Sequence, residues 1–230
     1  MEFIWEGIST AFRLIISLDR EVFEIVIFTL YIGLIGILIS SLMGIPIGLF
    51  LFQKKFPGRQ FFLVILNTLM ALPTVVVGLT LFSILSKKGP LGNLGLLFSP
   101  GAIILGQVLL VTPLITGISF NAFQSIDKRA IWTAKSLGAN GFQVSLIILK
   151  EAKSMLLLSV VAGFGRVISE VGAAMMLGGN IKGYTRTITT AIALETGKGN
   201  FSLGIALGII LMFLAFLVNS FLTNLQKQRY

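Results

Sequence analysis

The chain has 230 residues, of which 55% are hydrophobic and only 12% are charged, and its mean hydropathy is +0.96. Soluble domains carry about 25% charged residues, so this composition indicates an integral membrane protein. The sequence contains no Cys and no His, which excludes disulfides, thiolate chemistry and the usual zinc sites. The net charge of +9 comes from short loops between apolar runs, where basic residues predict membrane topology rather than nucleic-acid binding.

The N-terminal stretch is amphipathic. It begins MEFIWEG, with acidic residues where a cleavable signal peptide would carry basic ones. Residues 3–18 are interrupted by Glu6 and Arg13, which makes this stretch too short and too charged to cross a bilayer. We therefore predict an interfacial helix within residues 1–20.

Five longer apolar runs follow, and a bilayer core needs about 20 apolar residues in a helix. Spanning segments are helices or closed barrels, and these runs lack the short alternating pattern of barrel strands. We therefore predict an all-α integral membrane protein with one domain over residues 21–226. Its five predicted spans are residues 25–52, 61–86, 102–125, 155–177 and 201–225.

Three residues within these runs predict local geometry. Pro73 removes a helical hydrogen bond, so it is expected to bend the second span. Gly44 and Gly48 are small residues four apart, a spacing that lets two helix backbones approach closely. We interpret this pair as packing within the chain, with a dimer seam as the alternative.

The loops indicate an orientation. Residues 53–60, 127–153 and the C-terminal tail hold ten Lys and Arg, whereas the opposite side holds seven. The excess of basic residues faces the cytoplasm, which places the N-terminus outside and the C-terminus inside. Between the last two spans, residues 184–195 are apolar but too short to cross, so we expect a re-entrant or surface helix.

No enzymatic site is predicted in this chain. A phosphate-binding loop of the form GxxxxGK[ST] is missing, because Gly197-Lys198 is followed by Gly199. A Ser/His/Asp or Cys/His set is impossible without His or Cys. We therefore predict no catalytic residue, no metal site and no cofactor, and any energy must come from a partner subunit or an ion gradient.

A polar island separates the third and fourth spans and reads DKRAIWTAKSLGANGFQVSLIILKEAK over residues 127–153. Residues 130–137 are able to form a short helix, and Gly138 and Gly141 let the chain turn sharply. A soluble-looking helix between two spans faces water, where a soluble partner is able to dock. The alternative is an ordinary solvated loop.

Two charged residues lie inside the fourth apolar run. Arg166 and Glu170 are four apart, so on one helix face they are able to pair. One interpretation is a packing salt bridge that fixes the orientation of the helix. The other is that Arg166 supplies positive potential to an anion path while Glu170 limits how tightly the anion binds.

The loop after this run carries polar donors. Arg186 stands between Thr185 and Thr187, and these groups suit a tetrahedral oxyanion or the carboxylates of a partner protein. The alternative is a plain exposed loop.

The polar island resembles the cytoplasmic coupling motif of ABC importer permeases, in which a Glu-Ala-Ala triplet is followed by Gly and then by an aliphatic residue. Here the triplet is Trp132-Thr133-Ala134, followed by Gly138 and Ile148. The leading Glu and the closing Pro of that motif are missing, and Glu151 stands at the position of the Pro.

A second segment resembles the oxyanion branch of these permeases, which serves molybdate, sulfate and tungstate. It reads GFGRVISEVGAAMMLGGN over residues 163–180, followed by TRT at 185–187. Together with LNTLMALPTVVVG at residues 66–78, it is most similar to tungstate-type permeases. The similarity extends from about Asp19 to the C-terminus.

This resemblance implies a type I ABC importer transmembrane domain with a coupling helix at about 128–141. The residues expected to contact the ATPase are Trp132, Thr133, Ala134, Lys135, Leu137, Gly138 and Ala139. The candidates for the translocation pathway are Pro73, Arg166, Glu170 and Asn180. The candidates for contact with a binding protein are Lys182, Thr185, Arg186 and Thr187.

The implied assembly is a homodimer in a bacterial or archaeal cell (inner) membrane, with two cytoplasmic ATPase subunits and an extracytoplasmic solute-binding protein. The implied cargo is tungstate, with molybdate or sulfate as alternatives. An ion-coupled secondary transporter would show paired halves and several buried carboxylates, whereas Glu170 is the one acid within these runs. A non-transporting scaffold would leave Arg166 and Glu170 without a role.

Overall fold

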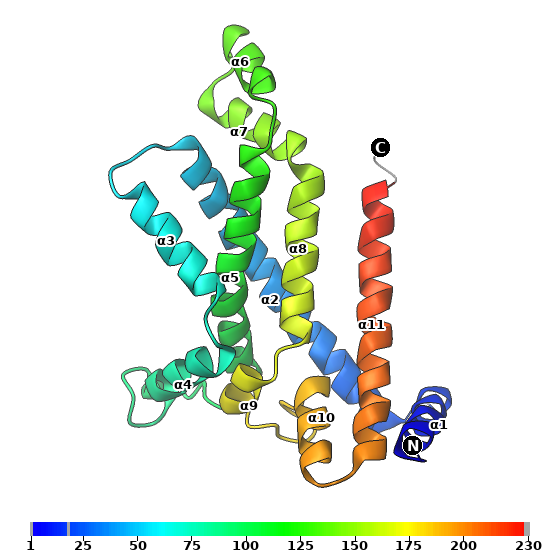
Figure 1. Cartoon of the computed structure of the whole chain (residues 1–230). Coiled ribbons are helices and arrows are strands. Elements are labelled where there is room, and N and C mark those ends of the chain that lie inside the picture. Colours follow the sequence, from blue (N-terminus) through cyan, green and yellow to red (C-terminus); the bar gives the residue numbers. More distant parts are fainter. Residues whose placement is uncertain (1, 18, 228–230) are drawn as a thin grey trace.

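The computed structural model describes residues 2–17 and 19–227, and every regular element in this part of the chain is a helix. This confirms the predicted all-α fold class. Four long helices stand side by side and connect two ends of an elongated molecule (Figure 1). They are α2 (Arg20–Gln53), α5 (Pro100–Gln124), α8 (Lys153–Ile168) and α11 (Phe201–Lys227).

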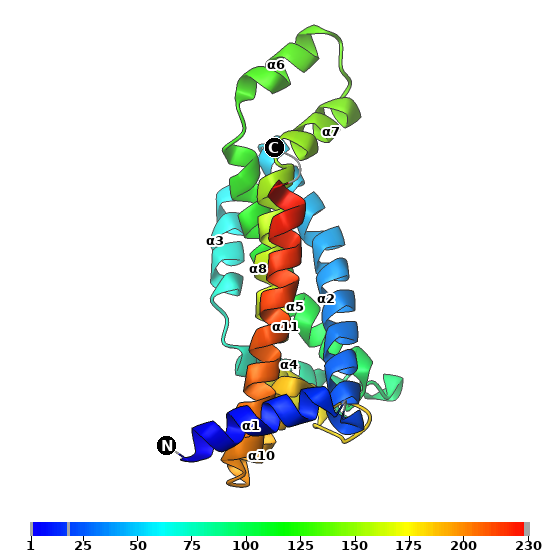
Figure 2. The ribbon, with the colours of Figure 1, turned by 90° about the vertical axis from the view of Figure 1, so that its right-hand side faces the viewer.

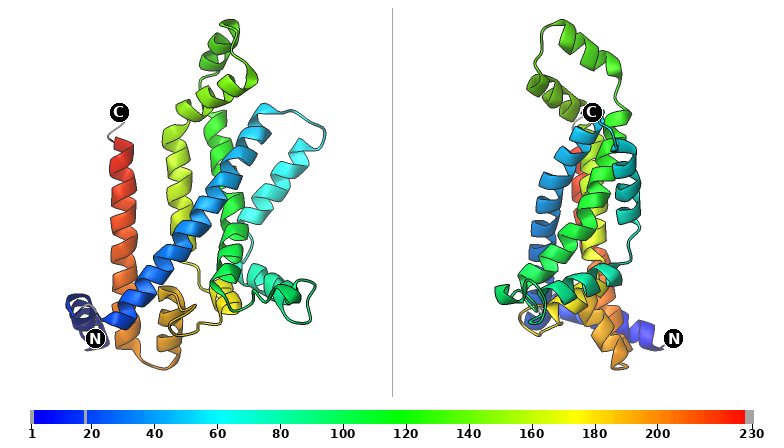
Figure 3. Two further views of the ribbon diagram at one scale, coloured as in Figure 1. Left: turned by 180° about the vertical axis from the view of Figure 1, so that it is seen from behind. Right: turned by 90° about the vertical axis from the view of Figure 1, so that its left-hand side faces the viewer.

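The two ends carry different short helices. One, called the α6 end below, holds α6 (Lys128–Ser136) and α7 (Gly141–Glu151). The other, called the α10 end, holds α1 (Glu2–Ile16) and α10 (Ile188–Gly197). Views from behind and from the side show the same separation along the length of the long helices (Figure 3).

Close contact between α2 and α5 forms the centre of the bundle. A Cβ atom on Gly44 would lie 3.0 Å from Ile115 Cγ2, and one on Gly48 would lie 3.0 Å from Thr116 O. A Cβ atom at either position would be crowded, so glycine favours this close approach of the two backbones. The interpretation that Gly44 and Gly48 serve packing within the chain is therefore confirmed.

The main apolar core lies where α8 covers the α2–α5 seam. Most of its buried residues come from these three helices, and a buried hydroxyl pair, Ser119 and Ser159, joins α5 to α8 at 3.3 Å. Such polar contacts satisfy groups that lipid would leave without a partner. The central members of the core are Ile37, Val111, Ile115, Phe164 and Val167.

Two of the predicted spans are interrupted. The second consists of α3 (Arg59–Met70) and α4 (Thr74–Leu85), which meet at 98°. Pro73 is extended, with φ −63° and ψ 130°, so it begins a new helix instead of bending a continuous one. The fourth span consists of α8 and α9 (Gly172–Gly178), which meet at 59°.

By length and composition, three described helices suffice to cross a membrane, namely α2, α5 and α11, the last of these over Phe201–Ser220. The number rises to five when each bent pair counts as one span. The five predicted spans therefore depend on this way of counting.

The N-terminal helix α1 lies across the foot of α11 (Figure 2). It packs there closely at Gly7, since a Cβ atom on this residue would lie 2.6 Å from Ile205 Cγ2. Trp5 and Phe12 are exposed on this helix, and its interfacial position stays a prediction. Leu18, the last residue of the predicted amphipathic stretch, lies outside the described residues.

The predicted short helix before the last span is α10, although it begins at Ile188 rather than at residue 184. It stays at the α10 end and packs against α11, as expected for a segment too short to cross. A 3-10 turn, η1 (Gly92–Leu94), lies in the loop between α4 and α5.

Replacing Gly48 by Val should destabilise the chain, because the added methyl groups meet the α5 backbone. Overpacking of this kind costs about 1–3 kcal/mol, which a lower Tm of the detergent-purified protein would reveal. The matched control is Gly208→Val in α11, where a Cβ atom would meet nothing within 4 Å. Equal loss of stability in the two variants would contradict the role of the α2–α5 seam.

Candidate functional site

The segment between α5 and α8 forms a defined turn at the α6 end, called the elbow below (residues 127–151). Asp127 starts α6, because its Oδ1 accepts a hydrogen bond from the Arg129 N–H at 2.9 Å. At the other end of α6, the Gly138 N–H donates to Lys135 O and the Ala139 N–H donates to Ala134 O, both at 3.0 Å. This pattern closes a helix with a left-handed residue, and Gly138 has φ +84°.

Helix α7 begins at Gly141, two residues after Ala139, and it fixes the shape of the elbow. Asn140 and Gln143 form a reciprocal capping box at the start of α7. Ile131 and Ala139 pack against buried Val144 and Ile148, so α6 is anchored on α7. The elbow is therefore a built structure rather than a solvated loop.

The elbow exposes large apolar side chains at its tip. Trp132 is 64% exposed, Leu137 82% and Phe142 71%. Thr133 and Lys135 are exposed beside them, Ala134 is buried and Ala139 is half-buried. The structure thus brings together the seven predicted coupling residues, and an exposed apolar tip indicates a protein partner.

The predicted pairing of Arg166 with Glu170 is wrong. Helix α8 ends at Ile168, so Glu170 lies beyond the helix and the four-residue spacing no longer places both side chains on one face. No ion pair joins these two residues, and among the described residues none is found at Arg166.

Glu170 instead builds the break between α8 and α9. Its side chain is buried, and Oε1 accepts a hydrogen bond from the Ala173 N–H at 2.8 Å, in the first turn of α9. Its backbone carbonyl accepts a hydrogen bond from Thr189 Oγ1 at 2.7 Å, which attaches α10 to the same point. The acid of the fourth span therefore serves the local fold in this conformation.

The two interrupted spans meet at their breaks. A Cβ atom on Gly172 would lie 3.0 Å from Thr74 Oγ1, and one on Gly78 would lie 2.9 Å from Ala173 Cα. Pro73 and Glu170, predicted separately as pathway residues, are therefore brought to neighbouring turns. Sequence reasoning missed this contact, because about a hundred residues separate the two breaks and a glycine alone does not identify its partner.

Asn180 lies at the end of α9 in a left-handed conformation, with φ +51°. Asn tolerates this region better than most residues. Its Nδ2 donates a hydrogen bond to Thr190 O at 3.3 Å, whereas its Oδ1 is buried without a partner among the described residues. Asn180 thus connects the end of α9 to α10.

The loop between α9 and α10 uses its threonines internally. Thr185 is fully buried, and its Oγ1 donates to Gly178 O and accepts from the Ile181 N–H. Thr187 is also buried and caps α10 through the Thr190 N–H. Neither hydroxyl is therefore at the surface, in contrast to the predicted role as contact donors.

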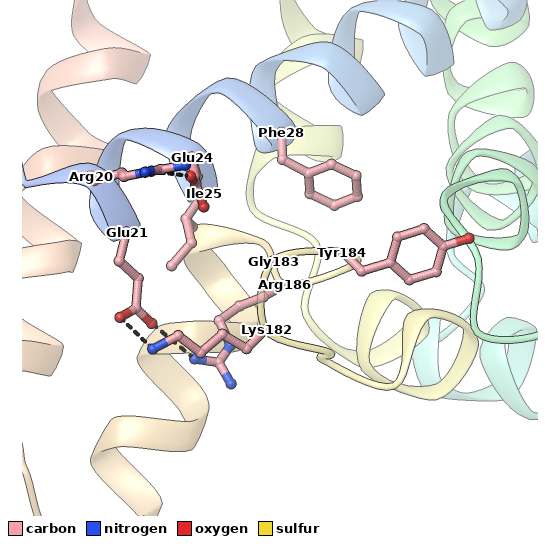
Figure 4. A pocket seen from close by; sticks show the side chains of 9 residues that line it. All are labelled: Arg20, Glu21, Glu24, Ile25, Phe28, Lys182, Gly183, Tyr184 and Arg186. Carbon is pink, nitrogen blue, oxygen red and sulfur yellow. Dashed lines mark hydrogen bonds and ion pairs between the residues drawn. The ribbon is translucent and has the colours of Figure 1, made fainter.

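The cations of this loop line an open pocket of about 490 Å³ at the α10 end (Figure 4). Lys182 Nζ lies 2.7 Å from Glu21 Oε2, and Arg186 Nη1 lies 3.4 Å from Glu21 Oε1. The Lys182 side chain is 66% exposed but that of Arg186 only 15%, and the Nε of Arg186 has no hydrogen-bond partner among the described residues. Sequence reasoning did not identify Glu21, which lies far away in the chain.

A further ion pair closes the α10–α11 turn. Lys198 Nζ donates to Glu195 Oε1 at 2.9 Å, and Asn200 Nδ2 donates to Oε2 at 3.1 Å. The hydrogen bond from Lys198 holds the pKa of the Glu195 carboxyl below its usual value. The turn next to the pocket is therefore fixed while Glu195 is ionised.

Changing Glu170 separates its capping role from its charge. In Glu170→Gln a carbonyl oxygen still accepts from the Ala173 N–H, so we expect little change in Tm. Glu170→Ala removes the acceptor and should cost about 1–2 kcal/mol in unfolding free energy. Thermal unfolding of the purified protein measures both, and a large loss in Glu170→Gln would show that the charge itself matters.

Solved structures share this fold. The chain superimposes on the MetNI methionine ABC transporter in an inward-facing conformation with a TM-score of 0.71 and 16% identity, over 94% of this chain and 97% of the other. It superimposes on a bacterial alginate ABC transporter, solved with its alginate-bound periplasmic protein, with a TM-score of 0.79 and 18% identity, over 96% and 86% of the two chains. At these identities the likeness concerns the fold, which is that of type I ABC importer transmembrane domains.

Sequence relatives extend over the whole chain. The tungstate uptake system permease protein TupB of Peptoclostridium acidaminophilum is 39% identical over 99% of this chain and 100% of its own length. TupB of Campylobacter jejuni is 38% identical over 99% and 95%. A probable anion ABC transporter permease of Haloferax volcanii is 38% identical over 84% and 85%.

The family comparison agrees with the resemblance seen in residues 163–187. Residues 36–229 match the family described as binding-protein-dependent transport system inner membrane component. This match covers most of the chain and includes both interrupted spans and the elbow. The chain is therefore a multi-pass membrane protein and belongs to this permease family.

Proposed function

We propose that this chain is the membrane-spanning subunit of an ABC importer for tungstate. The observation that carries the proposal is the identity of 38–39% to two tungstate uptake permeases over 99% of the chain. A dianion needs such a path, because an isolated charge in hydrocarbon costs many kcal/mol.

Molybdate and sulfate are the alternative cargoes. A sulfate permease and a molybdenum permease of Escherichia coli are more distant, at 27% and 25% identity. The three anions are all tetrahedral, so a separate solute-binding protein is the natural place for discrimination among them. An ion-coupled secondary transporter finds less support, because Glu170 is used as a helix cap.

The distribution of charge supports an orientation with the α6 end in the cytoplasm. That end holds two acids, Asp127 and Glu151, against many cations. At the α10 end, acids and cations occur in similar numbers, which fits the extracytoplasmic side. The cations of the α6 end whose side chains the structure describes are Lys54, Lys55, Arg59, Lys128, Arg129, Lys135, Lys150 and Lys153.

The exposed faces support assembly of two copies around a central path. Helix α3 has no buried residue, and Phe61, Phe62 and Val64 are more than half exposed on it. Val75 and Val76 extend this apolar surface onto α4. In a homodimer, a second copy and the lipid would cover this surface, and the α4–α9 contact would lie near the outer mouth of the path.

The elbow is connected so that it can transmit force from two cytoplasmic ATPase subunits. Residues 125–127 lead from α5 into α6, and Ala152 alone joins α7 to α8. A partner that moves the elbow would therefore displace α5 and α8, two of the three core helices. The breaks beside Pro73 and Glu170 would then open or close the outer side, as a rigid-body change between two access states.

The function is tested by reconstituting the chain with its ATPase subunit and solute-binding protein in vesicles. We expect ATP-dependent tungstate uptake that excess molybdate or sulfate inhibits only weakly. Equal uptake of the three anions would contradict the preference for tungstate, while it would still support an importer of oxyanions. Uptake by the chain alone, without the ATPase, would refute the proposal.

Replacing Gly138 by Val should uncouple ATP hydrolysis from uptake. The site has open space, but φ +84° is unfavourable for a β-branched residue, so the turn between α6 and α7 must change. Transport per ATP hydrolysed should fall about tenfold or more, while membrane insertion is unchanged.

The matched control for this variant is Gly141→Val, three residues away. A Cβ atom there also meets nothing within 4 Å, and no positive φ is required. Uptake and hydrolysis should stay coupled in the control. If Gly138→Val transports as well as the control, the elbow does not couple the two processes.

Lys182 and Arg186 support docking of the binding protein at the α10 end. Lys182→Gln should lower the association rate with that protein about two- to fivefold at low salt, with the difference vanishing at high salt. Surface plasmon resonance on the reconstituted complex measures this rate. Lys87→Gln, at another exposed cation of the same end, should bind as the parent does, and an equal effect there would contradict a specific contact.

A further inference from the structure

The α6 end contains a second pocket, of about 680 Å³, between the elbow and the turn that joins α2 to α3. One wall is a single face of α6, with Lys128, Ile131, Trp132 and Lys135 at helical spacing. The opposite wall comes from residues 52–59. The floor includes Gln124, the last residue of α5, and Val144 of α7.

The lining of this pocket is strongly basic. Five cations line it, and its described lining residues include no carboxylate. The four lysines among them make no salt bridge within the described residues. Like charges that face each other across an open space repel, so a bound anion would stabilise both walls. The five cations are Lys54, Lys55, Arg59, Lys128 and Lys135.

One of these cations is held in place by the fold. Arg59 Nε donates a hydrogen bond to Leu51 O at 2.8 Å, and its guanidinium lies 5.2 Å from the centre of the Phe120 ring. The guanidinium is therefore positioned without a carboxylate partner, with donor groups left for an oxyanion. The flexible lysines on both walls are suited to bind the same anion from several sides.

We propose that this pocket binds a tetrahedral oxyanion of the phosphate class. Its position points to the headgroup of an anionic phospholipid, because its floor lies where the long helices end. Exposed Phe50, Phe61 and Phe62 form the neighbouring apolar surface of α2 and α3. Basic pockets between membrane helices on the cytoplasmic side suit such headgroups. The inference does not depend on which anion is transported.

A bound anion would connect the elbow to the α2–α3 turn. In the single chain, apolar packing on α7 and on the ends of α2 and α5 supports α6. An oxyanion between Lys128 and Lys54 would add a polar contact between α6 and the turn that joins α2 to α3. The resting position of the coupling elbow would then depend on the occupancy of the pocket.

The test measures the Tm of the purified full-length chain in neutral detergent. The probes are dioctanoyl phosphatidylglycerol, its phosphatidylcholine counterpart, sodium phosphate, and sodium chloride at equal ionic strength. A ligand of the folded state raises the Tm as its concentration passes its dissociation constant. We expect the anionic lipid or phosphate to raise the Tm, and the choline lipid and chloride to have no such effect.

Two variants remove charge from opposite walls, namely the double substitution Lys54→Gln with Lys55→Gln, and the single substitution Lys128→Gln. Each should raise the half-saturating concentration of the anion about tenfold. The matched control is Lys150→Gln with Lys153→Gln, two exposed lysines of the same end that do not line the pocket. The control should bind the anion as the parent chain does.

The probes also identify the source of the oxyanion. A shift with phosphatidylglycerol alone assigns the site to a lipid headgroup, and equal shifts with phosphate assign it to a free anion. No shift with either, or an equal loss in the control pair, overturns the proposal. Protection of Lys54 and Lys55 from chemical modification by the ATPase subunit, without any effect of anions, also overturns it in favour of a protein partner.

Discussion

The close approach of α2 and α5 is the contact on which the rest of the structure depends. Gly44 and Gly48 bring the two backbones together, and α8 then covers the seam with Phe164 and Val167. Lipid gives little hydrophobic driving force between helices, so close packing and buried polar contacts must hold them. The Ser119–Ser159 pair adds such a contact at the same place. This three-helix core positions both ends of the molecule.

The core makes the middle of the molecule rigid, whereas the breaks in the second and fourth spans lie toward the α10 end. Helix α8 continues through Ala152 into α7 at the α6 end, but it stops at Ile168 on the other side. The broken backbone there is satisfied within the protein, since Glu170 caps α9 and its carbonyl accepts from Thr189. Non-helical backbone at membrane depth is tolerated only when it is satisfied in this way. The likeness to type I importer domains agrees with this arrangement.

The sequence predicted the elements better than the contacts between them. Apolar length identified the runs that became helices, and Gly138 correctly marked the left-handed end of α6. The pairing of Arg166 with Glu170 failed, because helical spacing presumes an unbroken helix and nothing local announces the end at Ile168. The ion pair of Glu21 with Lys182 joins residues 161 positions apart, a separation at which one sequence without an alignment carries no pairing information.

The positions of the exposed and buried polar groups explain why the two ends are suited to different partners. At the α10 end, Thr185 and Thr187 are used inside the loop, and Glu21 neutralises part of the charge of Lys182 and Arg186. A partner that docks there must therefore compete with an internal carboxylate, which favours a weak and reversible contact. At the α6 end, exposed Trp132 and Leu137 lack any internal competitor among the described residues. That end is accordingly suited to a partner that stays bound for longer.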